Sequence, residues 1–399
     1  MEIIAGGDIT SPQGFIAGAT ACGIKKSGLD LCVIASERPA FAAGVFTTNK
    51  VKAAPVLLCQ EHLRHGRARA VVVNSGNANA CTHEQGAADA LEMARLTAEK
   101  LGIAPSEVLV ASTGVIGVHL PMAKVREGIG AVRLSREGGQ EAAKAIMTTD
   151  TRPKTCAVRL DVGGRTVTIG GMAKGSGMIH PNMATMLAFV TTDAAVTDSG
   201  FLRACLLEAA DRSFNLISVD GDTSTNDTLI LLANGAAGND PIRASTPAAA
   251  AFQDGLNCVT AELAKAVARD GEGATKLIEV RVRGAATQED ARKAARAVVC
   301  SNLVKSAVYG ADPNWGRILC AAGYSGAEVD QERADIAVGH VQLMKDGQIL
   351  PFDRRQASAQ FAGTDVFIFV DLHLGDAEAV AWGCDLTEAY VDINAKYTT

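Results

Sequence analysis

A glycine-rich loop leads directly into an apolar strand between residues 174 and 189, and this junction constrains the chain more than any other stretch. The glycines at 175 and 177 permit backbone conformations that are closed to other residues, and Pro181 fixes its own φ. Residues 186–189 read as an apolar strand that anchors the downstream side in a sheet. The sequence therefore predicts a tight, strained entry into a buried strand.

Thr185 stands at this entry, where a threonine can serve as a nucleophile after self-cleavage. A threonine hydroxyl needs a base, and its own backbone nitrogen becomes an α-amine once the bond between Ala184 and Thr185 is cut. Such an amine titrates at about 7.7–8.0, so roughly a third is neutral near pH 7.5. His180 lies close enough in sequence to tune this step, or is an exposed loop residue. A plain loop that enters a strand, with Thr185 as an ordinary β-branched strand residue, explains the same spacing.

Composition narrows the class of protein. The chain has 399 residues, of which 48% are hydrophobic and 21% charged, enough for one large or two medium domains. Its net charge of -6 gives no basic excess for binding nucleic acid. Residues 1–7 lack a signal-peptide pattern and no apolar run has membrane length, so a cytoplasmic protein is expected. The ten cysteines form no Cys-x-x-Cys pair, which fits neither a zinc site nor a disulfide scaffold.

Hydrophobic periodicity predicts alternating strands and helices without a linker between domains. Strands are predicted at residues 70–73, 108–110, 229–232, 277–282 and 366–374. Helices are predicted at residues 85–101, 121–134, 202–214 and 247–269. Hairpins are predicted to turn at Gly163-Gly164 and at Asp346-Gly347. This pattern alone supports a mixed α/β or α+β fold.

Two further motifs suggest binding chemistry. Thr113-Gly114 follows a predicted strand and offers a hydroxyl and a backbone N–H, which suit the oxyanion of acyl transfer, although an ordinary strand-end turn looks the same. The stretch that begins at Asp220 starts like a calcium loop, but Thr225 replaces the glycine at its sixth position and Leu231 the glutamate at its twelfth. A calcium site is therefore disfavoured, and no metal site is predicted.

Several long motifs, in order along the whole chain, resemble those of the ornithine acetyltransferases, also called glutamate N-acetyltransferases. Residues 177–187, Gly-Met-Ile-His-Pro-Asn-Met-Ala-Thr-Met-Leu, are similar to the self-processing site of that family. The other matching motifs are residues 74–81, 112–117, 220–227, 309–317 and 394–399.

The resemblance implies a layered αββα arrangement with mixed sheets. It also implies self-processing into an α chain, residues 1–184, and a β chain, residues 185–399, which share one core and assemble as a heterotetramer. The implied reaction moves an acetyl group from N2-acetyl-L-ornithine to L-glutamate by a ping-pong mechanism through an acetyl-threonine, in arginine biosynthesis. No cofactor is required, and acetyl-coenzyme A as an additional donor is left open.

Individual roles follow from the resemblance at matching positions. Thr185 is the implied nucleophile, the cut lies between Ala184 and Thr185, and Thr113 with Gly114 forms the implied oxyanion hole. The implied substrate contacts are Thr151, Lys174, Thr185, Glu272, Asn394 and Thr399. From the residues alone, Lys174 and Glu272 also read as solvated loop charges, and Asn394 and Thr399 as a frayed terminus.

Two other functions remain as alternatives at this point. A hydrolase built on the same self-cleaved nucleophile would use water as the acceptor, as β-peptidyl aminopeptidases do. A small-ligand or calcium-binding protein would use the loop of residues 220–227 instead. Amide turnover with and without glutamate separates the transferase from the hydrolase, and a metal titration tests the calcium-binding protein.

Overall fold

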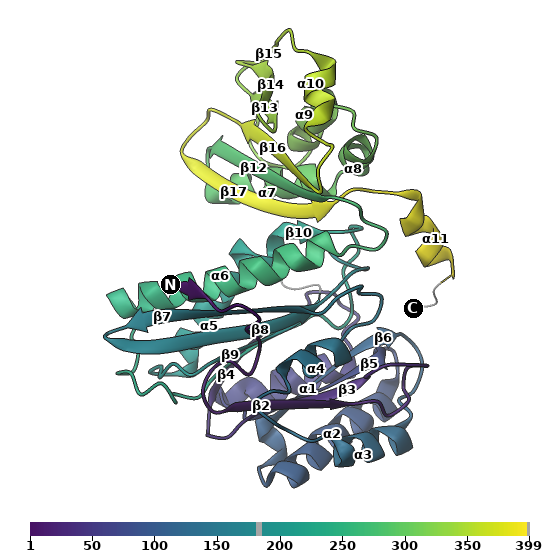
Figure 1. Cartoon of the computed structure of the whole chain (residues 1–399), viewed down its shortest axis with the longest axis vertical. Helices are drawn as coiled ribbons and strands as arrows, with labels where there is room; N and C mark the ends of the chain where they lie inside the picture. Colours follow the sequence, from purple (N-terminus) through teal and green to yellow (C-terminus); the bar gives the residue numbers. More distant parts are fainter. Residues whose placement is uncertain (181–185, 397–399) are drawn as a thin grey trace.

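The computed structural model describes residues 1–180 and 186–396, so Ala184, Thr185 and Thr399 lie outside the described residues. Three sheets succeed one another along the long axis of the molecule (Figure 1). The four-stranded sheet lies at one end, the six-stranded sheet in the middle and the seven-stranded sheet at the other end.

The six-stranded sheet has the order β1-β7-β8-β9-β11-β4. Its strands are β1 (Glu2–Ile3), β4 (Phe41–Phe46), β7 (Lys154–Val162), β8 (Arg165–Lys174), β9 (Leu187–Thr192) and β11 (Thr228–Ala233). Strands β9 and β11 are parallel, whereas β8 with β9 and β4 with β11 are antiparallel. The hairpin predicted at Gly163-Gly164 joins β7 to β8, and both glycines have positive φ. The strand predicted at residues 186–189 is β9, which is buried along its whole length.

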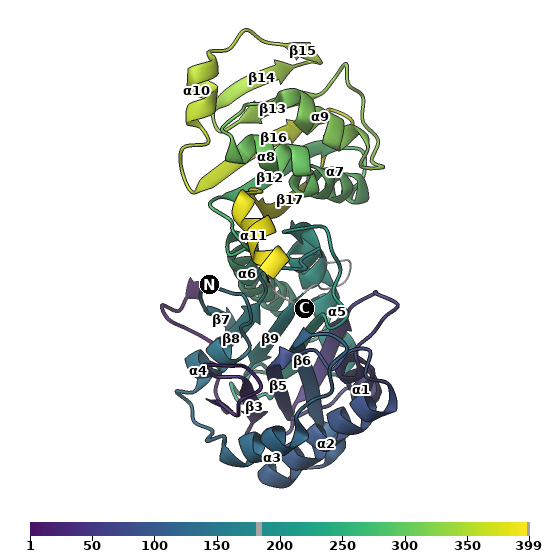
Figure 2. The same cartoon turned by 90° about the vertical axis from the view of Figure 1, so that its right-hand side faces the viewer.

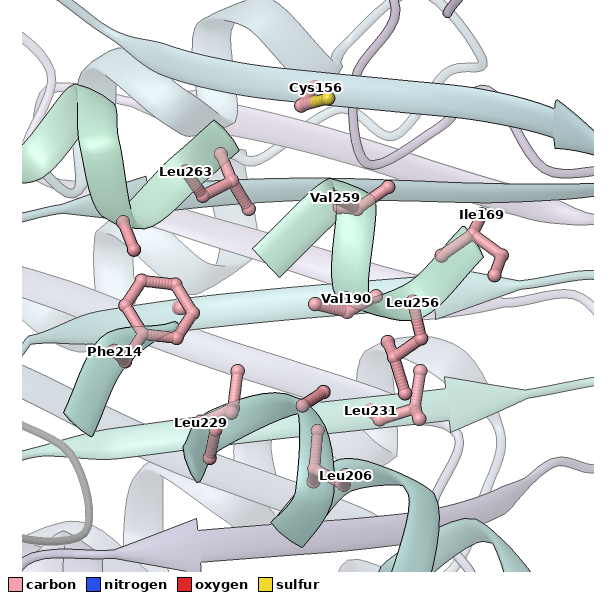
Figure 3. Packing of buried hydrophobic residues seen from close by; sticks show 14 of the residues in the cluster. Cys156, Ile169, Val190, Leu206, Phe214, Leu229, Leu231, Leu256, Val259 and Leu263 are labelled. Carbon is pink, nitrogen blue, oxygen red and sulfur yellow. The ribbon is translucent and has the colours of Figure 1, made fainter. Parts of the chain in front are cut away.

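Helices α5 (Ser199–Arg212) and α6 (Pro247–Arg269) cover one face of this sheet. Figure 3 shows Leu256, Val259 and Leu263 of α6 in one hydrophobic cluster with Ile169 and Val190 of the strands. Helix α6 has the predicted bounds because Thr246 caps its first turn and Pro247 stands at its first position, where no N–H is needed. Helix α5 ends two residues earlier than predicted, and the 3-10 turn η3 (Phe214–Leu216) follows it.

The opposite face of the six-stranded sheet packs on the four-stranded sheet β2-β3-β5-β6, through residues such as Ile34, Val73, Phe189 and Ile230. The strands of the smaller sheet are β2 (Phe15–Thr20), β3 (Leu31–Ser36), β5 (Ala70–Asn77) and β6 (Val108–Val115). Helices α2 (His83–Leu101) and α3 (Met122–Ala131) cover its outer face. The layers are therefore helix, sheet, sheet and helix, which confirms the fold class.

Shorter elements complete this part of the chain. Helix α1 (Ala54–His62) packs on β6 and α2, and α4 (Gly139–Ala145) packs on β2. The 3-10 turns η1 (Leu63–His65) and η2 (Pro105–Glu107) precede β5 and β6. Helix α3 stops three residues short of the predicted end.

The seven-stranded sheet forms a C-terminal lobe that the periodicity did not separate. Its order is β10-β17-β12-β16-β13-β14-β15, and the tight turn predicted at Asp346-Gly347 joins β14 to β15. The strands are β10 (Ile217–Ser218), β12 (Leu277–Ala285), β13 (Asp335–Val338), β14 (Val341–Lys345), β15 (Gln348–Ile349), β16 (Asp365–Asp371) and β17 (Ala377–Cys384). The helices are α7 (Gln288–Cys300), α8 (Asn302–Tyr309), α9 (Trp315–Gly323), α10 (Arg354–Ala359) and the terminal α11 (Glu388–Lys396).

Helix α11 leaves this lobe and descends toward the lower sheets (Figure 1 and Figure 2). The C-terminal segment is thereby brought to residues that are far away in the sequence. In the described part of the chain, no helix is both long and apolar enough to cross a membrane.

Candidate active site

One cavity of about 130 Å³ brings together five of the residues that the sequence predicted for the site. These residues are Thr113, Gly114, Lys174, Glu272 and Asn394. Met186, the first described residue after the expected cut, lines the same cavity. Residues from the four-stranded sheet, the six-stranded sheet and the terminal helix therefore face one space.

Thr113 and Gly114 lie at the end of β6, where the parallel pairing with β5 shifts its register beside Gly76. Gly114 has a φ of +132°, and a Cβ at this position would lie 2.3 Å from the carbonyl carbon of Gly76. Only glycine suits such a backbone approach. The side-chain amide of Asn226 donates to the carbonyl oxygen of Ser112 at 2.8 Å, which holds the strand end from the other side. The geometry thus presents a hydroxyl and a fixed backbone segment to the cavity.

Lys174 ends β8 and points its ammonium group at this strand end. Its Nζ donates to Oγ1 of Thr148 at 2.8 Å and lies 3.5 Å from Oγ1 of Thr113. Burial lowers the pKa of Lys174, and the carboxylate of Asp150, 3.8 Å away, opposes this effect. The cavity therefore has a cationic wall next to the candidate oxyanion residues, suited to a carboxylate ligand.

A buried ion-pair network contacts Lys174 through Asp150. Nζ of Lys154 lies 2.6 Å from Oδ1 of Asp150 and 2.6 Å from Oδ2 of Asp270. Burial alone would raise the pKa of Asp150, but Lys174 and Lys154 together with hydrogen bonds hold it well below its ordinary value. Thr151 belongs to this network, since its backbone N and its hydroxyl both donate to Asp270. Thr151 is exposed and does not line the cavity.

Glu272 forms the opposite, anionic wall of the cavity. It is 7% exposed, and Nδ2 of Asn394 donates to its Oε2 at 2.7 Å, across 122 positions of sequence. Its backbone N donates to the carbonyl of Ser176 at 3.0 Å. A Cβ at Gly177 would lie 2.4 Å from the Glu272 carboxylate, so this glycine lets the loop approach the acid. The glycine-rich loop and the terminal helix are therefore joined through Glu272.

The loop of residues 219–228 holds both described flanks of the expected cut. Upstream, Asp220 accepts hydrogen bonds from the backbone N of Met178 at 2.5 Å and of Ile179 at 2.9 Å. Downstream, the backbone N of Thr228 donates to the carbonyl of Met186 at 2.9 Å. The Asp220 carboxylate is thus bound by backbone N–H groups of this chain.

His180 lies among Ser218, Cys300 and Arg296. Its Nδ1 is 3.2 Å from Oγ of Ser218 and 3.4 Å from Sγ of Cys300. Burial, with a smaller effect from Arg296, lowers the pKa of His180 to about 4, so the ring is neutral near pH 7. His180 is therefore a partly buried residue and not an exposed loop histidine.

Several residues that line the cavity were given no site role from the sequence, among them Asp227 and Tyr390. Asp227 belongs to the motif that was considered as a calcium loop, and its position directly before β11 was the only signal available. Among the described residues, the carboxylates of this motif do not gather as metal ligands; the one such group comprises Asp335, Asp346 and His373, in the C-terminal lobe.

The chain is similar to known proteins over most or all of its length. The family model described as the ArgJ family matches residues 16–399. The chain is 60% identical, over 404 residues and 100% of both chains, to the arginine biosynthesis bifunctional protein ArgJ of Symbiobacterium thermophilum. It is 52% identical, over 402 residues, to the protein of that name from Dehalococcoides mccartyi, covering 100% of this chain and 99% of the relative. A crystal structure of the arginine biosynthesis bifunctional protein argJ from Bacillus halodurans is 50% identical, with a TM-score of 0.51 over 52% of this chain and 98% of that chain.

Proposed function

The chain belongs to the ArgJ family, and we propose that it moves the acetyl group of N2-acetyl-L-ornithine to L-glutamate through an acetyl-threonine at Thr185. The enzyme acts in arginine biosynthesis. The observation that carries the proposal is the single cavity whose cationic wall, at Lys174, faces an anionic wall, at Glu272. Such a pair of walls suits an amino acid, which carries a carboxylate and, in ornithine, a second ammonium group.

In the first half-reaction, the Thr185 hydroxyl attacks the acetyl carbonyl and its α-amine takes the proton. Thr113 and the backbone N–H of Gly114 stabilise the oxyanion. The bond between the carbonyl carbon and the ornithine nitrogen then breaks as the α-amine returns its proton to that nitrogen. In the second half-reaction, the amino group of glutamate attacks the acetyl-threonine and the same steps run in reverse. Lys174 binds the substrate carboxylate, and Glu272 with Asn394 binds the side-chain ammonium group of ornithine.

We propose that the cut between Ala184 and Thr185 creates an α chain, residues 1–184, and a β chain, residues 185–399. Two observations support this division. In the six-stranded sheet, β9 and β11 from the second part lie between β8 and β4 from the first part, so both parts are needed for one core. The solved argJ chain is matched over 98% of its own length by only 52% of this chain, as expected where a protein exists as two chains.

The assembly and the location are part of the same proposal. Two α and two β chains form a heterotetramer, which a native mass measurement tests, and the enzyme works in the cytoplasm. Thr399 completes the substrate contacts, and Thr151, which does not line the cavity, acts through the Asp270 network that supports Lys174. No cofactor is needed, and acetyl release from acetyl-coenzyme A in the presence of glutamate tests the second donor.

The test is Thr185→Ala. The wild-type protein is expected to separate into two fragments on a denaturing gel, with masses that place the cut between Ala184 and Thr185. Thr185→Ala is expected to remain one chain without transferase activity. Thr166→Ala, at an exposed threonine of β8, serves as the control and should be cut and active. A fully active wild-type protein of intact mass would overturn the mechanism, and acetate release that glutamate does not divert into N-acetylglutamate would favour the hydrolase.

A further inference from the structure

Asp227 is a buried carboxyl group of the cavity to which the mechanism above gives no task. It lies directly before β11, is 2% exposed and lines the cavity together with Lys174 and Met186. Its Oδ2 atom is shielded from water and has no hydrogen-bond partner among the residues that the structure describes. A buried unpartnered carboxyl oxygen is costly, so its retention beside a substrate cavity calls for a donor that arrives with the ligand.

Among the described residues that line the cavity, the cation near Asp227 is Lys174. The ammonium of Lys174 is engaged by Thr148 at 2.8 Å and Asp150 at 3.8 Å. Burial raises the pKa of Asp227 well above its ordinary value, and the opposing effects of Ser224, Thr47 and Lys174 are smaller. Among the described residues, the other titratable groups that line this cavity are Lys174, Asp220, Asp222, Glu272 and Tyr390. Asp227 can therefore carry a proton near neutral pH more readily than an exposed aspartate.

The proposed reaction, on which this inference rests, moves a proton as well as an acetyl group. Glutamate arrives with an α-ammonium group, but only the neutral amine can attack the acetyl-threonine. When the acetyl–nitrogen bond breaks, the α-nitrogen of ornithine is a neutral amine. Ornithine then takes up a proton and leaves the enzyme with an α-ammonium group. One proton thus passes from glutamate to ornithine in each cycle, although the two amino acids never occupy the cavity together. Either solvent or a group of the enzyme holds this proton between the two stages.

We propose that Asp227 is the group that holds this proton. In the free enzyme its carboxyl is protonated. When the carbon–nitrogen bond of acetylornithine breaks, the ornithine nitrogen has gained the Thr185 proton, and Asp227 donates the one that makes it an ammonium ion. The acetyl-enzyme then contains the Asp227 carboxylate. Glutamate binds, its α-ammonium gives one proton to this carboxylate, and the amine attacks; the second proton returns to the Thr185 oxygen, which restores the free enzyme.

The other carboxyl groups of the cavity are less suited to this task. Asp220 accepts the backbone N–H groups of Met178 and Ile179. Glu272 accepts the amide of Asn394. Asp222 is exposed to solvent and so is subject to direct exchange with water. Asp227 alone among these four combines full burial with an unpartnered oxygen.

The first experiment compares two acceptors in Asp227→Asn, with Asp254→Asn, at an exposed aspartate of α6 that does not line the cavity, as the control. Each variant is first shown by mass to be cut, and both transfers are measured on acetyl-enzyme formed beforehand, because the first half-reaction is common to the two acceptors. Transfer to glutamate should fall by about 10²–10⁴-fold in Asp227→Asn, the usual range for loss of a general acid–base group. Transfer to hydroxylamine, a neutral amine at the assay pH, should fall much less, because it has no such proton to lose. The glutamate rate of the variant should recover as pH rises, and Asp254→Asn should behave like the wild type.

The second experiment needs no variant, and it decides the matter if Asp227→Asn is not cut. Wild-type enzyme is mixed with acetylornithine in weak buffer, and a pH indicator follows the burst in which the acetyl-enzyme forms. No net proton uptake is expected, because the enzyme supplies the proton that ornithine carries away. Uptake of one proton per acetyl-enzyme would overturn the inference, as would an Asp227→Asn variant that loses both acceptors equally. A wild-type enzyme that transfers acetyl to neither acceptor would instead refute the proposed function itself.

Discussion

Gly114→Ala tests the candidate oxyanion site through its backbone geometry. The new Cβ would lie 2.3 Å from the carbonyl carbon of Gly76 and 2.5 Å from the backbone N of Asn77. Ordinary contact begins at 3.4 Å, so these backbone atoms must separate by about 1 Å, and a displacement of that size at a reacting centre costs roughly 10²-fold in rate. Loss of one oxyanion donor costs about 10²–10³-fold, or about 2.7–4 kcal/mol. We therefore expect the turnover number to fall by at least about 10²-fold.

The control for this variant is Gly117→Ala, three residues further along the same loop. Gly117 also has a positive φ, of +80°, but a Cβ there would meet no atom within 4 Å. Both variants therefore carry similar backbone strain, of about 1–3 kcal/mol, and only Gly114→Ala carries the clash. The assay is acetyl transfer at saturating substrate, after mass analysis has shown the cut in both proteins. A cut Gly114→Ala enzyme that keeps the turnover of Gly117→Ala would refute the reasoning.

Three further outcomes are expected. Lys174→Ala should raise KM for acetylornithine with less effect on turnover at saturation, because a carboxylate partner binds the ground state and the transition state alike; a selective fall in turnover would contradict this role. Activity should rise with pH around a midpoint of about 7.7–8.0 as the Thr185 α-amine loses its proton, with no second limb from His180, whose pKa is about 4; a rate that is flat from pH 6 to 9 with chemistry rate-limiting would contradict the amine as base. The lowered pKa of Asp150 contributes stability that is complete above the ordinary aspartate value of about 3.9 and is lost as pH falls through the lowered value. Asp150→Asn, which leaves Lys154 and Lys174 less well paired, should therefore lower Tm at pH 7 by the equivalent of about 3–5 kcal/mol and by less at pH 3; an equal loss at both values would contradict the linkage.

Local signals made part of the fold predictable. Helix α6 was located within its observed bounds because its cap, Thr246, and its first residue, Pro247, are both strong start signals. The turns at Gly163-Gly164 and Asp346-Gly347 were found because positive φ at both central positions restricts the residue types. Strand β17 (Ala377–Cys384) was missed, since its alternating alanines give little contrast between its two faces. Its neighbours β12 and β16 were predicted at residues 277–282 and 366–374, but not that they belong to one separate sheet.

The site was predictable only in part, and for a different reason. Thr113 and Lys174 are 61 positions apart, and no local pattern indicates that Oγ1 and Nζ lie 3.5 Å from one another. The family resemblance supplied these residues, whereas spacing alone favoured an ordinary strand-end turn at Thr113-Gly114. Asp227 was visible only as one acid of an acidic loop. Its burial and its unpartnered oxygen depend on how β11 meets β9 and β4, which is a property of the assembled sheets.

The interleaved order of the six-stranded sheet has a consequence for the lifetime of the mature enzyme. Strand β9 pairs with β8, and β11 with β4, across the proposed boundary between the two chains. After the cut, neither chain can depart without the sheet being dismantled, so dilution should not dissociate them. Once unfolded, however, the two chains must find each other again in a bimolecular encounter, whereas the precursor folded as a single polymer. The precursor would thus fold reversibly, whereas the mature enzyme would be kinetically stable and would stay folded mainly because it unfolds slowly.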